Sequence, residues 1–448
     1  MELKQHITRN WQLAYPVMLS QLGHVMVGVA DSVMVGRIGA EPLAAASLAS
    51  VVFHLLMTFG IGISYSITPI VAAADGEQNH ERITQTLKHG IMICMLSAII
   101  LLCIQLLSGF ALPYINQPEE VVQLAIPYLY IIAFSLIPIM VFQTFRQFAE
   151  GLSLTRMAMV ITVGGNLLNI LLNYFLIYGK AGFPALGLNG AGYATLISRV
   201  VIGAGMMAYI FYHQRFALYK AAFAFGNYSK SLIRRMLGIG IPAGIQFVFE
   251  VSAFGFSAIM MGWMGTTALA AHQIAINMAT ISYMTTSGLA AAATIRVGNQ
   301  LGKKDIVNMQ RAGLSLIGMA MVIMSVWALV FIMGRFYFPT LYISDTEVIM
   351  LAGSLLIIAG FFQLSDGLQV VCIGALRGLQ DMKIPTLFIF IAYWVIALPL
   401  GYCLGFIFDF GPIGIWWGLF IGLTITGVIM YMRFRHLSKK LLKKYYER

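Results

Sequence analysis

Three carboxylates interrupt stretches of chain that are otherwise apolar enough to cross a lipid bilayer: Asp31, Glu250 and Asp366. An ionised carboxylate inside a membrane costs several kcal/mol, so residues of this kind usually bind or relay a cation and face protein or water. The other acidic residues lie in connections or near the ends of apolar stretches, where we expect them to be solvated. The three buried carboxylates are therefore the first candidates for function.

Amide side chains accompany the first of these carboxylates. Asn169 and Asn173 are four residues apart and would lie on one face of a helix. Their oxygens are suitable hard ligands for a dehydrated cation, if that helix packs beside the one that carries Asp31. The same amides could instead join helices through hydrogen bonds. The sequence leaves both interpretations open, and the first predicts a Na⁺ site made by Asp31, Asn169 and Asn173.

Aromatic and polar residues accompany the other two carboxylates. Phe254 follows Glu250 by one helical turn, and Phe362 precedes Asp366 by one turn. The next apolar stretch after Glu250 contains two further polar candidates, Asn277 and Tyr283. Aromatic faces near carboxylates suit a lipophilic organic cation, although ordinary packing explains most aromatic residues. We therefore predict a second site, where Glu250 and Asp366 bind an organic cation or a coupling ion such as Na⁺.

The composition shows which elements must position these residues. Hydrophobic residues make up 59% of the 448 residues and charged residues 10%, against about 25% charged in soluble domains. Stretches of roughly twenty apolar residues, enough to span a hydrocarbon core of about 30 Å, recur along the chain and must be helical in lipid. Twelve such spans are expected, at about 11–36, 45–72, 88–112, 124–148, 157–178, 190–213, 236–262, 271–296, 310–334, 347–374, 385–408 and 413–434.

The chain also contains an internal repeat. Residues 16–76 and 242–302 align without a gap at an offset of 226, with 13 identities in 61 positions. A membrane chain of two related halves is typical of transporters whose substrate path lies between the halves. We expect an all-α integral membrane protein with two pseudo-symmetric six-helix bundles. Its predicted parts are an N-terminal lobe (1–213), an inter-lobe linker (214–235), a C-terminal lobe (236–434) and a basic tail (435–448).

Basic residues predict the orientation of the chain. Of the 28 Lys and Arg residues, 24 fall in alternate connections on one side of the predicted spans, three fall on the other side, and Arg199 lies within a span. Cytoplasmic connections carry the excess of Lys and Arg, so both termini are expected in the cytoplasm. The net charge of +11 is then explained by topology and by attraction to anionic membrane lipids, not by a nucleic-acid partner.

Several motifs carry a family resemblance that covers essentially the full chain. Val29–Gly36, with Pro16 upstream, resembles the first helix of the multidrug and toxic compound extrusion (MATE) family. The second-half signatures of that family resemble four further stretches: Ala270–Ile274, Ile295–Gly302, Asp366–Val370 and Gly374–Gly378. The combination of Glu250 with Asp366 looks like the NorM-type bacterial branch.

The resemblance implies a V-shaped, twelve-helix antiporter in the bacterial cytoplasmic membrane, which exports cationic lipophilic drugs in exchange for Na⁺ or H⁺. By position, Glu250, Asp366 and Tyr283 match the family's second-lobe cation and substrate residues. Asp31, Asn169 and Asn173 match the first-lobe cation site, where relatives can have an acid in place of Asn173. The implied protein is not an enzyme, needs no cofactor besides its coupling ion, and functions as a monomer.

Two other classes of protein fit the sequence less well. A lipid-linked oligosaccharide flippase of related fold would have the same two halves, but it is expected to line its cavity with Arg or Lys to hold pyrophosphate. In this chain Arg199 is the only Lys or Arg in the middle of a predicted span. A membrane-embedded enzyme would need a nucleophile or metal-ligand spacing that the sequence lacks. The sequence does not distinguish Na⁺ from H⁺ as coupling ion, because carboxylates serve both.

Overall fold

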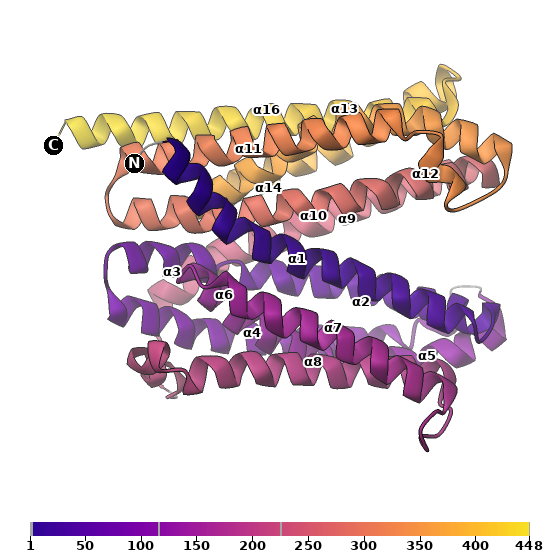
Figure 1. Cartoon of the computed structure of the whole chain (residues 1–448), viewed down its shortest axis with the longest axis horizontal. Helices are drawn as coiled ribbons and strands as arrows, with labels where there is room; N and C mark the ends of the chain where they lie inside the picture. Colours follow the sequence, from indigo (N-terminus) through magenta and orange to yellow (C-terminus); the bar gives the residue numbers. More distant parts are fainter. Residues whose placement is uncertain (1–2, 115–116, 225, 448) are drawn as a thin grey trace. The chain divides into compact units, whose positions relative to one another are not determined.

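The computed structural model describes residues 3–114, 117–224 and 226–447, and all regular secondary structure within them is helical. The elements, shown in Figure 1, are α1 (Leu3–Gly36), α2 (Ala40–Ser64), α3 (Ile67–Gly76), α4 (His80–Ser108), η1 (Leu112–Tyr114), α5 (Glu119–Phe134), α6 (Leu136–Gly151), α7 (Thr155–Tyr178), α8 (Gly187–Tyr212), η2 (Gln214–Phe223), α9 (Lys230–Trp263), α10 (Thr266–Gly302), α11 (Ile306–Met333), α12 (Tyr337–Thr340), α13 (Thr346–Gly378), α14 (Lys383–Phe390), η3 (Ile391–Ala397), α15 (Leu398–Tyr402), η4 (Cys403–Ile407) and α16 (Gly411–Tyr446).

The long helices correspond to the predicted spans. Eleven helical segments among the described residues are long and apolar enough to cross a membrane. Three of them combine successive elements: α2 with α3, α5 with α6, and α14 with η3, α15 and η4. The remaining predicted span lies in α10, which has 37 residues. It carries polar side chains along its length, among them His272, Gln273 and Asn277. The chain is thus an all-α, multi-pass membrane protein.

The repeat is visible in the local structure. Helices α2 and α10 begin at Ala40 and Thr266, and α3 and α10 end at Gly76 and Gly302, each pair 226 residues apart. Glycines with positive φ precede α2 and α10, 155° at Gly39 and 115° at Gly265, where other residues would be strained. Side-chain N-caps recur at the same offset: Asn79 caps the N-terminus of α4, and Asp305 caps that of α11. The two halves therefore share their helix boundaries as well as their sequence pattern.

The helices form two compact units, Met1–Met18 with Ile245–Arg448 (unit 1) and Leu19–Gly244 (unit 2). These boundaries differ from the lobe boundaries expected near residues 213 and 236, because the first helix of each half is divided between the units. The division occurs at Met18 in α1 and Gly244 in α9, which are again 226 residues apart. A glycine packs closely against each of these division points. A Cβ at Gly62 of α2 would lie 2.3 Å from the Gly244 backbone, and a Cβ at Gly288 of α10 would lie 2.4 Å from Met18.

Two features of unit 1 position its polar residues. Helix α13 has the largest buried share of all the candidate spans, so polar residues along it face protein. The segment from α14 to η4 contains two π-helical stretches, Ile391–Ala397 and Cys403–Ile407. Such stretches widen a helix locally and are frequent at functional sites.

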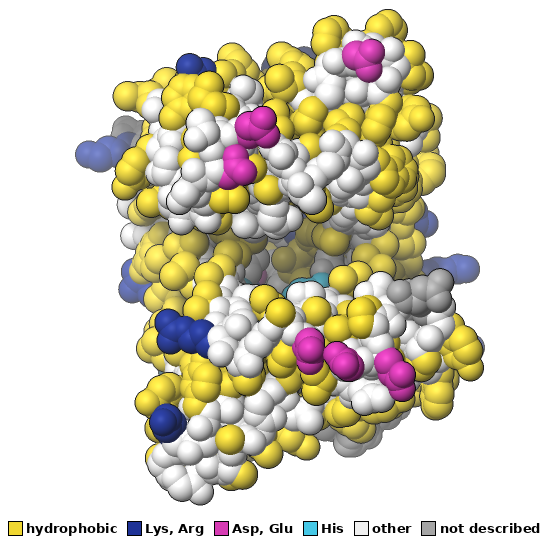
Figure 2. Space-filling view, turned by 90° about the vertical axis from the view of Figure 1, so that its right-hand side faces the viewer, with side chains coloured by type: hydrophobic (Ala, Val, Ile, Leu, Met, Phe, Trp, Pro, Cys, Tyr) yellow, Lys and Arg dark blue, Asp and Glu magenta, His cyan; other side chains and the backbone are white. Residues whose placement is uncertain are grey.

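The start of α1 and the end of α16 lie at the same end of unit 1 (Figure 1). Figure 2 looks onto the opposite ends of the helices and shows mainly hydrophobic and neutral side chains, scattered acidic ones and few basic ones. This distribution agrees with the count of Lys and Arg in alternate connections.

Candidate cation and substrate sites

The structure brings together the three predicted residues of the first-half cluster, within unit 2. Asn173 of α7 donates a hydrogen bond from Nδ2 to the Asp31 carboxylate of α1, and another to Asn169 Oδ1 at 3.1 Å. Asn169 in turn donates to Ser198 Oγ of α8 at 3.3 Å. Both asparagines are buried, and Asp31 is half-buried. These hydrogen bonds orient the Asn173 side chain so that its amide nitrogen faces the Asp31 carboxylate.

This cluster offers oxygen atoms to a cation. The Oδ1 atom of Asn173 is buried and accepts no hydrogen bond from the described residues. A buried polar atom without a partner calls for an explanation such as an ion or a water molecule. The described residues contain no group of three or more His, Cys, Asp or Glu side chains that could hold a metal. A cation here would therefore be bound by carboxylate and amide oxygens.

Arg199 of α8 is a charged neighbour that the sequence analysis did not place. Its guanidinium donates to Ser135 Oγ at 2.7 Å and lies over the Phe53 ring, 4.9 Å from the ring centroid. It interacts electrostatically with Asp31, without an ion pair between them in the described structure. No basic residue lies within a helical turn of Asp31 in sequence, so only the packing of α8 reveals this charge. The fixed positive charge opposes a second cation at Asp31.

The second carboxylate pair lies in unit 1. Glu250 Oε1 of α9 accepts hydrogen bonds from Gln246 Nε2 at 3.3 Å and from Gln369 Nε2 at 3.0 Å. Asp366, three residues before Gln369 on α13, is buried and interacts electrostatically with Glu250. Two carboxylates that interact in this way repel each other when both are ionised, so the pair favours a bound cation or proton.

A tyrosine on the first π-helical stretch completes this network. Tyr393 is buried and donates from its hydroxyl to Gln369 Oε1 at 3.3 Å. Gln369 thus connects Tyr393 to Glu250. Gln246, Gln369 and Tyr393 were not among the predicted site residues. The spacing of Gln246 one turn before Glu250, and of Gln369 three residues after Asp366, could have identified the two amides, whereas nothing in the sequence marks Tyr393.

The two aromatic residues singled out near the pair, Phe254 and Phe362, pack against each other. The Phe254 and Phe362 ring centroids are 6.1 Å apart, and Phe254 lies 5.8 Å from the Tyr393 ring. Tyr283 of α10 interacts electrostatically with Tyr393. Asn277 accepts a hydrogen bond from Gln273 at 3.2 Å and forms none with Glu250 or Asp366 in the described part of the chain.

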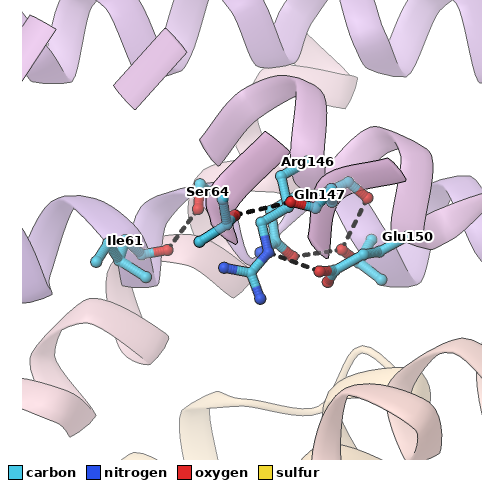
Figure 3. Close-up of polar contacts among 8 residues, drawn as sticks. Ile61, Ser64, Arg146, Gln147 and Glu150 are labelled. Atoms are coloured by element: carbon cyan, nitrogen blue, oxygen red, sulfur yellow. Dashed lines mark hydrogen bonds and ion pairs between the residues drawn. The ribbon is translucent and has the colours of Figure 1, made fainter. Parts of the chain in front are cut away.

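One expectation about acidic residues was wrong. Glu150, which lies at the end of a predicted span and was expected to be solvated, is 3% exposed. Figure 3 shows its carboxylate paired with Arg146 on the same helix, α6, at 2.7 Å. On the same helix, Phe148 packs against Phe216 and Tyr219 of η2 in the inter-lobe linker.

Comparison with solved structures identifies the class of fold. The chain superposes on the MATE crystal structure described as a bent conformation with a TM-score of 0.90 at 20% identity, covering 99% of this chain and 97% of the other. The eukaryotic MATE transporter AtDTX14 gives a TM-score of 0.87 at 19% identity, with 99% of each chain covered. The fold is therefore that of the MATE transporters.

Comparison of sequences identifies the family. The MatE family model matches residues 16–175 and again 242–403, two segments that begin at the repeat-related Pro16 and Pro242. The chain is 35% identical to the multidrug resistance protein NorM of Photobacterium profundum over 433 residues, 94% of each chain. It is 33% identical to MdtK of Yersinia pseudotuberculosis over 434 residues, 96% of this chain and 95% of that one. The chain belongs to the MatE family.

Proposed function

We propose that this protein is a secondary active multidrug efflux antiporter of the bacterial cytoplasmic membrane, which exports lipophilic organic cations in exchange for Na⁺ or H⁺. The names of the NorM and MdtK relatives, both multidrug resistance proteins, support the general activity. The observation that carries the specific proposal is the Glu250 and Asp366 pair in unit 1, with the Phe254 ring one helical turn after Glu250 on α9. Carboxylates attract any cation, and an aromatic face favours an organic one.

The exchange depends on competition for these carboxylates. When the site faces outward, Na⁺ or H⁺ neutralises the pair, the organic cation loses its counter-charge, and it leaves. When the site faces inward, the ion leaves and a cytoplasmic organic cation takes its place. Because the two ligands differ in affinity for the two states, the ion gradient drives export by alternating access.

Neighbouring residues prepare the pair for this exchange. Amide N–H groups only donate, so Gln246 and Gln369 hold one oxygen of Glu250 and leave the other for a cation. Asp366 accepts no hydrogen bond from the described residues that would compete with a ligand. In unit 2, Asp31 and the Oδ1 atom of Asn173 provide a further ion site, whose affinity Arg199 limits.

The orientation follows from the basic connections. The end of unit 1 that carries both termini faces the cytoplasm, and its Lys and Arg side chains contact anionic lipid headgroups. Each chain contains both candidate sites, so the functional protein is a monomer.

Ethidium transport in proteoliposomes tests the proposal. An imposed Na⁺ gradient at clamped pH, or a pH gradient without Na⁺, should drive ethidium transport by the wild-type protein in the direction opposite to the ion. The gradient that drives transport identifies the coupling ion. Glu250→Gln and Asp366→Asn should each lose this movement while they remain folded. Wild-type transport by both variants would contradict the proposal, and movement of a lipid-linked oligosaccharide without ethidium transport would favour the flippase.

A further inference from the structure

A buried histidine distant from the carboxylates is held by a specific hydrogen bond. His272 of α10 is 2% exposed, and its Nδ1 atom accepts a hydrogen bond of 3.1 Å from Nε1 of Trp416 on α16. An indole N–H only donates, so Nδ1 must be the unprotonated nitrogen of the imidazole. His272 therefore supplies the acceptor that a fully buried tryptophan needs.

Trp416 is the first member of a row of aromatic rings that leads to the carboxylates; we call Trp416, Phe362, Phe254 and Tyr393 the aromatic row. The ring centroids of Trp416 and Phe362 are 5.9 Å apart, and the row continues from Phe362 to Phe254 and on to Tyr393. The row ends where the Tyr393 hydroxyl meets Gln369, which binds Glu250. Five elements, α9, α10, α13, η3 and α16, contribute to this path.

The members of the row differ in exposure. Trp416, Phe362 and Tyr393 are each at most 4% exposed, whereas Phe254 is half-buried and presents part of its ring outside the packed core. Contacts along the row orient Phe254, because close-packed rings leave each other few positions. The orientation of Trp416 is thus transmitted to Phe254, which lies one helical turn after Glu250 on α9.

We propose that His272 is a positioning residue for substrate recognition: by fixing Trp416, it sets the aromatic face that Phe254 offers to an organic cation. This inference rests on the proposed function of the carboxylate pair. Without an acceptor, the buried indole N–H is left unpaired, which favours a rotated Trp416 and a disordered row. The small coupling ion is affected little, since the hydrogen bonds to Glu250 come from Gln246 and Gln369.

Three variants test the proposal with purified protein. His272→Leu removes the acceptor at similar volume, His272→Asn restores an oxygen acceptor near the position of Nδ1, and Trp416→Phe removes the donor. His272→Leu should weaken equilibrium binding of ethidium and raise its transport KM by about threefold to tenfold, the range that corresponds to the net contribution of one hydrogen bond. The maximal transport rate and the ion concentration for half-maximal activity should be unchanged, and His272→Asn should recover most of the loss.

A double variant separates positioning from general stability. With Trp416→Phe already present, His272→Leu should cause no further loss of ethidium affinity, because no indole N–H remains to be satisfied. The proposal is overturned if His272→Leu leaves ethidium binding unchanged, if the Asn and Leu variants behave alike, or if the effects of His272→Leu and Trp416→Phe simply add. Failure of the wild-type protein to bind or move ethidium would instead refute the proposed function, and this inference with it.

Discussion

At the scale of single residues, the second-lobe site depends on an amide that joins three elements. Gln369 of α13 donates to Glu250 of α9 and accepts from Tyr393 of η3. Because it is 1% exposed, water cannot replace either hydrogen bond if the amide is lost. The position of the Glu250 carboxylate is therefore tied to a residue that is itself uncharged.

Replacing this amide should damage the site more than the fold. Gln369→Leu should raise the ethidium KM and the ion concentration for half-maximal transport by about tenfold each, since a hydrogen bond to a charged group contributes roughly 1.5–3 kcal/mol. Gln105→Leu on α4 is a matched control, because both polar atoms of that buried glutamine have no hydrogen-bond partner in the described residues. Transport kinetics report on both variants, and equal losses in the two would contradict a specific role for Gln369.

The buried ion pair of α6 makes a prediction about folding stability. Glu150→Gln should lower the free energy of unfolding by about 3–5 kcal/mol, because it leaves the Arg146 charge buried without its partner. Arg146→Met combined with Glu150→Gln should recover much of that loss. Glu77→Gln is the exposed comparison: it breaks the pair with Arg82, also at 2.7 Å, and should cost at most about 1 kcal/mol. Thermal unfolding in detergent would measure all three, and equal losses for Glu77→Gln and Glu150→Gln would refute the argument from burial.

At the scale of elements, the repeat places equivalent caps on equivalent helices. Asn79 Oδ1 accepts from the backbone N–H of Arg82 at 2.9 Å, and Asp305 Oδ1 accepts from that of Asn308 at 3.0 Å. Burial alone would raise the pKa of Asp305, but the hydrogen bonds with Asn308 outweigh it and hold that pKa below its ordinary value. One of the two caps is therefore charged and the other is neutral.

These caps should respond differently to pH. Replacing either with Ala should lower the free energy of unfolding by about 1 kcal/mol at neutral pH. Asp305 has a lower pKa in the folded state, so its contribution is fully present above the unfolded pKa of about 3.9 and is lost as the pH falls through the folded pKa. The difference between wild type and Asp305→Ala should thus shrink below about pH 4, while that for Asn79→Ala should not. Unfolding midpoints of the wild type and both variants, measured across this pH range, test the prediction. If the stability loss of the two variants depends on pH in the same way, a charged cap at Asp305 is contradicted.

At the scale of the whole molecule, the first helix of each half is shared between two compact units. Met18 and Gly244, the division points, are equivalent in the repeat, and so are Gly62 and Gly288, the glycines packed against them. The glycines allow backbones to approach where no side chain would fit. The same local solution has therefore been kept in both halves.

Filling one of these contacts should destabilise the protein. Gly62→Ala would place a Cβ 2.3 Å from the Gly244 backbone, and we expect a loss of about 1–3 kcal/mol or more in the free energy of unfolding. Gly164→Ala on α7 is the control, because a Cβ there meets nothing within 4 Å and alanine favours a helix. Thermal unfolding should show a loss for the first variant and none for the second; equal stability of Gly62→Ala and wild type would contradict the packing argument.

The sequence predicts some levels of this structure better than others. The helices are predictable from the lengths of the apolar stretches, and the repeat from its constant offset. Neither prediction requires knowledge of how the helices pack. The cluster of Asp31, Asn169 and Asn173 is predictable because both amides share one helix face. The links from Gln369 to Glu250 and from Arg199 toward Asp31 join helices far apart in the chain, and their pairing depends on tertiary packing. The burial of Glu150 and the division of α1 between the units depend on such packing too.

The central claim is that a coupling ion and an organic cation compete for Glu250 and Asp366. The most direct test is the equilibrium dissociation constant of ethidium, measured on purified protein at increasing Na⁺ concentration and, separately, at decreasing pH. Our account predicts that Na⁺ or H⁺ raises this constant for the wild type and has little effect on Glu250→Gln and Asp366→Asn, which bind ethidium weakly throughout. A wild-type constant that responds to neither ion would contradict the account.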